Sequence, residues 1–129
     1  MVLDTSAYSQ SRGNHHEVVA RIASADLVYM PTIVLGELEA AFRSGTRSAD
    51  NRLVLEAFLA EDFVEALPVT TDVARVYGSV FAELHEAGTP IPVNDIWIAA
   101  AAIDAGAHLV TFDSDFDRID RLERSVLAA

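Results

Sequence analysis

The stretch 92–106 constrains the fold most, because it reads as a helix that is apolar on almost every side. Pro92 and Asn94 are typical of a helix start, and Gly106 is typical of a helix end. A helix without a polar face must be covered by other elements all round. The sequence therefore predicts a domain that is built around this helix.

One charged residue, Asp95, nevertheless lies in the first turn of this helix. A helical wheel places it in the sector of Ile98, Ala99 and Ala102. A lone buried carboxylate is unfavourable unless a cation or hydrogen-bond donors receive it. The alternative is that Asp95 caps its own helix and interacts with the helix dipole. The positions of the other acidic residues distinguish between these two interpretations.

Composition narrows the class of protein. A chain of 129 residues with 51% hydrophobic and 22% charged residues predicts one soluble globular domain, 1–129. No apolar run is as long as a membrane span, and a first strand that starts at Val2 leaves no room for a signal peptide, so we expect a cytoplasmic protein. The absence of cysteine excludes disulfides, thiol catalysis and cysteine zinc sites. The net charge of −11 favours a basic partner or metal ions over non-specific nucleic-acid binding.

Short apolar strands alternate with longer helices along the chain. We expect strands at 1–6, 27–30, 63–67 and 108–112, helices at 15–25, 31–43, 48–61, 70–88 and 92–106, and a flexible connection at 9–14. Strands that alternate with helices of this length are typical of parallel strands joined by crossovers. The sequence therefore predicts an α/β fold.

Three acidic residues should reach one edge of such a sheet. Ligands gather at the carboxyl ends of parallel strands. Asp4 ends the first predicted strand, Asp113 follows the last, and Asp95 opens a crossover helix, which begins at the same edge. We therefore expect these three carboxylates to lie together.

A fourth acid, Glu37, should point inward from the helix 31–43. The apolar stripe of that helix consists of Val34, Leu38, Ala41 and Phe42, and Glu37 falls inside its arc. Glu39 falls outside the arc, one turn before Arg43, as expected of a solvated ion pair. Four like charges in one place require a counter-ion, and Mg²⁺ or Mn²⁺ suits oxygen ligands. The alternative is four unrelated caps and surface acids.

The ordered set of motifs resembles the PIN-domain ribonucleases, most closely the VapC toxins of bacterial and archaeal toxin–antitoxin pairs. The motifs are Leu3-Asp4-Thr5-Ser6-Ala7, Gly36-Glu37-Leu38, Pro92-Val93-Asn94-Asp95 and Thr111-Phe112-Asp113-Ser114-Asp115-Phe116. The resemblance spans almost the whole chain. It implies a three-layer fold, with a central parallel sheet of about four or five strands flanked by helices. It further implies a Mg²⁺- or Mn²⁺-dependent endoribonuclease that forms a homodimer and is inhibited by a small antitoxin.

The resemblance also assigns roles to residues. The acidic quartet is matched by Asp4, Glu37, Asp95 and Asp113; the supporting polar positions are matched by Thr5 or Ser6 and by Asn94. Asp115 is either an additional acid of the metal shell or a cap on the following turn. We expect Asp4, Asp95 and Asp113 to hold the metal and Glu37 to orient or deprotonate the attacking water. Phe112 departs from the family pattern, since a polar or basic residue is frequent there.

Substrate and partner binding require cations, which are scarce in so acidic a chain. RNA affinity relies on phosphate contacts, and the candidate residues are Arg12, Arg43, Arg47 and Arg118. The alternative for each of them is a solvated surface charge, which is the more common situation for arginine. A basic antitoxin segment could place an arginine in the acidic site instead of metal. Trp97, Tyr77 and Phe81 are candidates for dimer packing or for the core.

Other functions fit less well. A PIN nuclease of RNA processing or decay, without a toxin role, stays an open alternative. A neighbouring gene for a small basic protein would distinguish a toxin from such a nuclease. The segment 113–117 begins like an EF-hand loop, but Arg118 and Arg124 occupy the glycine and final glutamate positions. A haloacid-dehalogenase-type phosphatase needs a second aspartate where Ser6 stands. A binding domain without catalysis is disfavoured because all four acids are present.

Overall fold

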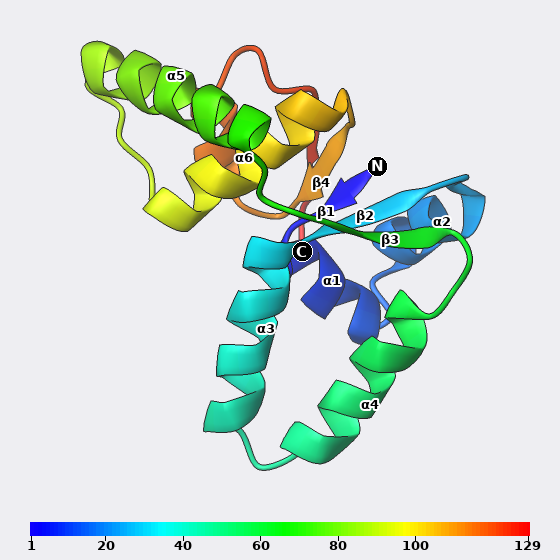
Figure 1. Ribbon diagram of the computed structural model, residues 1–129. Coiled ribbons are helices and arrows are strands. Elements are labelled where there is room, and N and C mark those ends of the chain that lie inside the picture. Colours follow the sequence, from blue (N-terminus) through cyan, green and yellow to red (C-terminus); the bar gives the residue numbers. More distant parts are fainter.

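A five-stranded parallel sheet forms the centre of the computed structural model, which describes residues 1–129 (Figure 1). The strands are β1 (Val2–Leu3), β2 (Val28–Pro31), β3 (Val64–Leu67), β4 (Leu109–Thr111) and β5 (Arg124–Val126). Their order is β3-β2-β1-β4-β5, and every neighbouring pair is parallel. The predicted α/β fold with a central parallel sheet is confirmed, and the number of strands is five.

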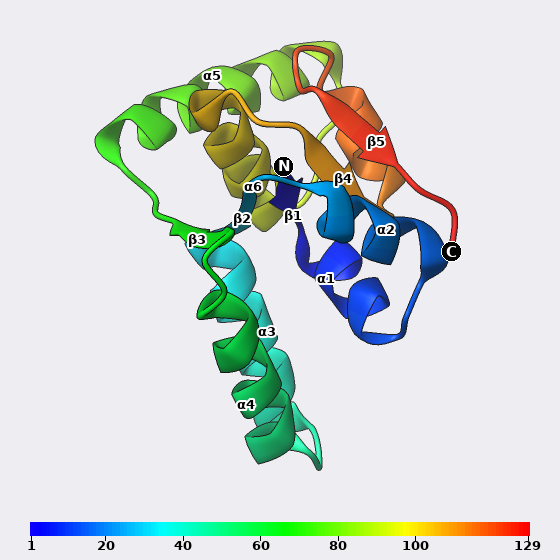
Figure 2. The ribbon, with the colours of Figure 1, turned by 90° about the vertical axis from the view of Figure 1, so that its right-hand side faces the viewer.

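Helices cover both faces of the sheet. They are α1 (Thr5–Arg12), α2 (His16–Ser24), α3 (Thr32–Ser44), α4 (Ser48–Leu59), α5 (Thr71–Ala87) and α6 (Val93–Ala105), followed by the 3-10 helix η1 (Ser114–Arg118). Figure 2 shows α5 and α6 on one face and α1 to α4 on the other, which gives the expected three layers. The hairpin of α3 and α4 projects away from the sheet. None of the helices combines the length and the apolar character that a membrane span requires.

The apolar helix of the sequence, α6, is buried as predicted. Its buried residues are Ile96, Ile98, Ala99, Ala100, Ala101 and Ala102. Gly106 ends α6 in the left-handed conformation, with φ of 62°, and Gly88 ends α5 in the same way. Thr70 caps α5 by accepting a hydrogen bond from the Val73 backbone N–H at 3.2 Å. The predicted ends of both helices are therefore correct.

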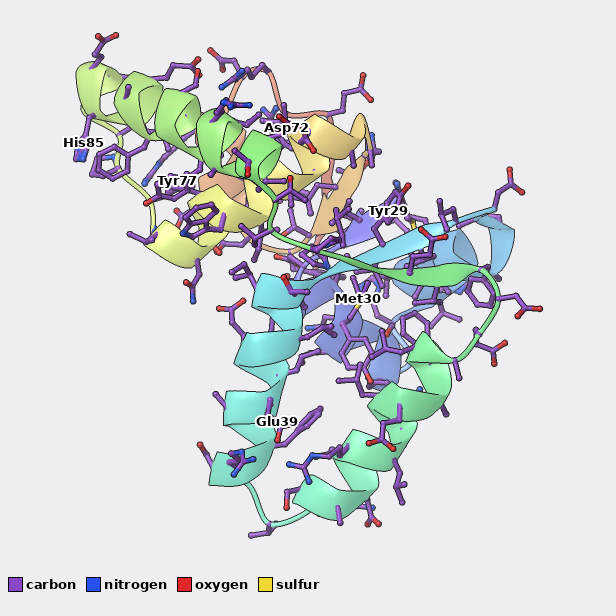
Figure 3. All side chains as sticks on the ribbon, in the orientation of Figure 1. Tyr29, Met30, Glu39, Asp72, Tyr77 and His85 are labelled. Carbon is purple, nitrogen blue, oxygen red and sulfur yellow. The ribbon has the colours of Figure 1, made fainter.

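Two side-chain groups hold the helices in pairs. In α3, Glu39 points toward α4 (Figure 3), where it accepts a hydrogen bond from Arg52 at 2.7 Å, and it also forms the predicted pair with Arg43 at 3.2 Å. Tyr77 of α5 stacks on Trp97 of α6 with 3.9 Å between the ring centres, and on Phe81 of its own helix at 6.0 Å. The Phe81 side chain is exposed, so a role in dimer packing stays a prediction.

The start of the chain differs from the prediction. The first strand ends at Leu3, and α1 occupies residues that we expected to form the end of a strand and a flexible connection. The reason is Asp4, whose Oδ1 accepts a hydrogen bond from the Ala7 backbone N–H at 2.8 Å and so caps a helix at once. Asp4 therefore ends β1 and starts α1.

Three smaller expectations are also corrected. The acidic tail contains a strand, β5, which pairs with β4 and was not predicted. Ala41 is exposed and does not belong to the buried stripe of α3, which consists of Val34, Leu38 and Phe42. Asn94 lies inside α6, because the helix begins at Val93 with Pro92 before it and no side chain caps it.

Candidate active site

Asp4 is the most deeply placed acid of the site, at 4% exposure. Its Oδ1 accepts hydrogen bonds from the Ser6 hydroxyl and the Ala7 backbone N–H, both at 2.8 Å. Its Oδ2 accepts one from the Thr111 hydroxyl at 2.5 Å. Burial raises the pKa of Asp4; these hydrogen bonds lower it in part, and the charge of Asp113 raises it further. The carboxylate is thus rigidly held where β1 ends.

Three further acids form a tight group. One carboxylate oxygen each of Asp95, Asp113 and Asp115 lies within 4.8 Å of the other two. They come from the first turn of α6, from the residue that caps η1, and from η1 itself. Asp113 Oδ1 accepts a hydrogen bond from the Asp115 backbone N–H at 2.9 Å, so Asp113 rather than Asp115 caps the turn. The side chain of Asp115 thereby joins the group.

The charges of all the other acids of the site affect the pKa of Asp95. Burial, the largest cause, raises its pKa to about 7 together with the charges of Asp113, Glu37, Asp4 and Asp115, in that order. Its side chain makes no capping hydrogen bond at the start of α6. The inward-facing interpretation of Asp95 therefore agrees with the structure, whereas the capping alternative does not.

Glu37 reaches the site from α3, as the helical wheel predicted. It is half-buried, and its Oε1 accepts a hydrogen bond from the Thr5 hydroxyl at 2.7 Å. Thr5 belongs to the first turn of α1, so this bond fixes the position of Glu37 relative to Asp4. Asn94 is exposed in the first turn of α6.

No basic side chain compensates the charge of the quartet. None of the ion pairs of the structure includes Asp4, Glu37, Asp95 or Asp113. Asp115 alone has a partner, Arg118, at 3.7 Å. Asp95 and Asp113, the two members of the tight group without a cationic partner, offer oxygen ligands that fit a hard divalent cation.

Our sequence reasoning did not single out Thr111. It is completely buried, and its hydroxyl contacts both Asp4 and the backbone N–H of Asp113, the latter at 3.0 Å. A signal was present, because Thr111 is a polar residue at the end of an apolar strand, two residues before a predicted site acid. A polar side chain at that place requires a buried partner.

The four predicted RNA-binding arginines do not form one cluster. Arg118 is the one that contacts a site acid. Arg12 and Arg47 line one surface pocket beside α4, where Arg47 lies 3.9 Å from Asp50. Arg43 belongs to the surface ion pair with Glu39 on α3. Their role in RNA binding stays a prediction.

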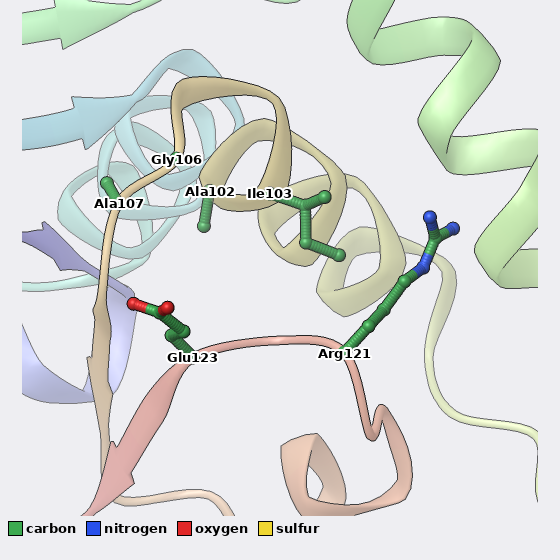
Figure 4. Close-up of a pocket in the computed structure, with 6 residues that line it drawn as sticks. All are labelled: Ala102, Ile103, Gly106, Ala107, Arg121 and Glu123. Carbon is green, nitrogen blue, oxygen red and sulfur yellow. The ribbon is translucent and has the colours of Figure 1, made fainter.

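A cavity of about 150 Å³ lies at the far end of α6 from Asp95 (Figure 4). It is lined by Ala102, Ile103, Gly106, Ala107, Arg121 and Glu123. Arg121 turns away from it toward α5 and pairs with Glu83 at 3.5 Å. This cavity is separate from the acidic site.

Comparison with known proteins identifies similar chains. The family model of the PIN domain matches residues 1–122. Ribonuclease VapC5 of Mycobacterium tuberculosis is 29% identical over 119 residues, which cover 92% of this chain and 87% of that protein. Ribonuclease VapC4 of the same organism is 32% identical over 93 residues, or 70% of each chain. The crystal structure of DNA-bound VapBC from Salmonella typhimurium has a TM-score of 0.86 and 26% identity, and the match covers 96% of this chain and 95% of that one.

Proposed function

The chain belongs to the PIN-domain family, and from this premise we propose that it is an endoribonuclease acting as the toxin of a type II toxin–antitoxin pair. The observation that carries the proposal is the convergence of Asp4, Glu37, Asp95 and Asp113 without a basic partner. The similarity to proteins named ribonuclease VapC, and to structures of VapBC complexes, supports the same activity and the same kind of partner.

Carboxylates of the site would hold a divalent cation, Mg²⁺ or Mn²⁺. We assign this task to Asp95 and Asp113 with Asp4 beside them, and we add Asp115 because its oxygen lies in the same tight group. When bound, such a cation neutralises phosphate charge and makes water a stronger nucleophile. The donors around Asp4 keep its carboxylate in one orientation for this role.

Glu37 is suited to act on the attacking water. Its Oε1 is held by the Thr5 hydroxyl, which leaves Oε2 free to orient a water molecule and accept its proton. The water oxygen would form a bond to phosphorus, and the bond from phosphorus to the 3′ oxygen would break. The 3′ oxygen leaves with the electron pair of that bond and takes up a proton. The products then carry a 5′-phosphate and a 3′-hydroxyl.

The partners follow from the charge. A net charge of −11 favours a basic antitoxin segment, and an arginine of that segment would satisfy the acidic site in place of the cation. A homodimer and a cytoplasmic location remain predictions from the sequence. A PIN nuclease without a toxin role is the second candidate, and a neighbouring gene for a small protein with a basic tail would favour the toxin.

Sequencing the ends of cleaved total RNA tests the proposal. The purified protein with Mn²⁺ or Mg²⁺ should leave 5′-phosphate ends, and a chelator should stop cleavage. Asp4→Asn should abolish cleavage while the circular dichroism spectrum stays that of a folded protein. Asp104→Asn, which removes a carboxylate from the exposed face of α6, is the matched control and should cleave normally. Cleavage that persists in Asp4→Asn, or in excess chelator, would overturn the proposed function.

A further inference from the structure

Two polar side chains are buried in this protein, Asp4 and Thr111, and they are bonded to each other. They lie 107 residues apart in the sequence and meet where β1 and β4 end. A fully buried hydroxyl is unfavourable unless its hydrogen-bonding capacity is used. The bond from the Thr111 hydroxyl to Asp4 uses this capacity, and it suggests that the hydroxyl acts on the Asp4 carboxylate.

Ser6 and Thr111 make the same pair of bonds on opposite oxygens of Asp4. The Ser6 hydroxyl accepts a hydrogen bond from the Phe112 backbone N–H at 3.0 Å and donates to Oδ1. The Thr111 hydroxyl accepts one from the Asp113 backbone N–H, also at 3.0 Å, and donates to Oδ2. A hydroxyl carries one proton. The two hydroxyls also lie 3.4 Å from each other, but each is closer to Asp4, at 2.8 Å for Ser6 and 2.5 Å for Thr111. Because the backbone N–H groups can only donate, the carboxylate of Asp4 is the nearest acceptor for both protons.

The sheet does not need the Thr111 hydroxyl. Backbone pairing of Val2 with Leu109 and of Leu3 with Val110 already sets the register of β1 and β4. Valine has the same branched shape as threonine and is equally suited to a buried strand. What a valine at position 111 would remove is the direct link between the Asp4 carboxylate and the backbone that carries Asp113.

We propose that Thr111 is a positioning residue, which fixes the carboxylate of Asp4 relative to Asp113 so that both can serve one divalent cation. The proposal rests on the proposed function and deepens it. Residues that hydrogen-bond a metal ligand without touching the metal set its orientation, and their loss weakens metal binding by about 10- to 100-fold.

Thermal denaturation in a series of Mn²⁺ concentrations tests this without RNA. We compare the wild type, Thr111→Val and Thr111→Ser, and measure the Mn²⁺ concentration that gives half of the maximal rise in melting temperature. Thr111→Val should raise this concentration at least tenfold, about the lower end of the range above, whereas Thr111→Ser keeps the hydroxyl and should stay within about threefold of the wild type. A merely structural role would lower the melting temperature of Thr111→Val at every Mn²⁺ concentration and leave the midpoint unchanged.

The outcomes separate the two proposals. If Mn²⁺ does not raise the melting temperature of the wild type, the proposed function and the positioning role both fail. If Mn²⁺ stabilises the wild type and Thr111→Val with the same midpoint, the positioning role alone is overturned. If Thr111→Val does not fold, the Mn²⁺ midpoints of Thr111→Cys and Thr111→Ser are compared instead. These two variants differ mainly in the strength of the hydrogen-bond donor at position 111. A midpoint at least about fivefold higher for cysteine supports the role, and equal midpoints overturn it.

Discussion

Replacing Asp95 by asparagine should stabilise the cation-free protein at neutral and alkaline pH. The folded state raises the pKa of Asp95 from 3.8 to about 7, so its ionisation is penalised only when the chain is folded. The wild type therefore loses stability as the pH rises between these two values, and the penalty is constant above the higher one. The asparagine side chain of the variant is neutral at every pH and escapes the penalty.

The magnitude follows from the same shift. Three pKa units correspond to about 4 kcal/mol for a completely buried group. Asp95 is only half-buried, so screening by solvent reduces this to roughly 2 kcal/mol. We therefore expect Asp95→Asn to be more stable than the wild type by about 2 kcal/mol at pH 8, and by close to zero at pH 4.

Urea unfolding at pH 4, 6 and 8, with a chelator present, measures this difference. Asp104→Asn removes an exposed carboxylate from the same helix, and its difference from the wild type should not grow with pH. Added Mn²⁺ should stabilise the wild type and have a much smaller effect on Asp95→Asn, because the variant lacks one of the proposed ligands. A free energy of unfolding for Asp95→Asn that does not rise relative to the wild type between pH 4 and pH 8 would refute the reasoning.

Further predictions concern RNA binding and local stability. Arg118→Ala should weaken RNA binding and reduce the slope of log affinity against log salt by about one, whereas Arg75→Ala on α5 should change neither; equal slopes for the wild type and Arg118→Ala would exclude a phosphate contact. Gly106→Ala should lower the free energy of unfolding by about 1 kcal/mol because φ is 62°, while Gly78→Ala inside α5 should raise it by up to about 1 kcal/mol; urea unfolding that ranks the two variants the other way contradicts the backbone argument. Thr70→Ala removes the cap of α5 and should lower the free energy of unfolding by about 1 kcal/mol in the same assay, and an unchanged value would mean that the cap is dispensable.

The long elements of the fold could be predicted because each has an independent local signal. In α6 the apolar character, Pro92 and Gly106 all agree, and in α5 the cap Thr70 and the terminal Gly88 agree. Alternation of such helices with apolar strands is sufficient to predict a parallel sheet.

The short elements at the two ends could not be predicted in the same way. The residues of α1 are mostly polar, and serine is a poor helix former, so the segment resembles a loop. The helix depends on Asp4 as its cap and on the burial of Ala7 and Tyr8 against the rest of the protein. β5 has three half-buried residues, and one of them, Arg124, is charged, so its pairing with β4 depends on tertiary contacts rather than on a pattern.

The positions of the acids could be predicted because the topology of the sheet determines them. Thr111 could not be predicted in this way, because topology does not determine which hydroxyl contacts which acid. The end of a strand and the start of a crossover helix place Asp4, Asp95 and Asp113 at the same edge of the sheet. Which hydroxyl orients a carboxylate depends on distances of a few tenths of an ångström between β1 and β4, and the sequence does not encode those directly. A useful rule follows: a threonine or serine at the end of an apolar strand, beside a convergent set of acids, is a candidate to orient one of them. Thr5 and Ser6 lie instead in the first turn of α1, yet they also hydrogen-bond site acids, Glu37 and Asp4, so hydroxyls as well as carboxylates shape this site.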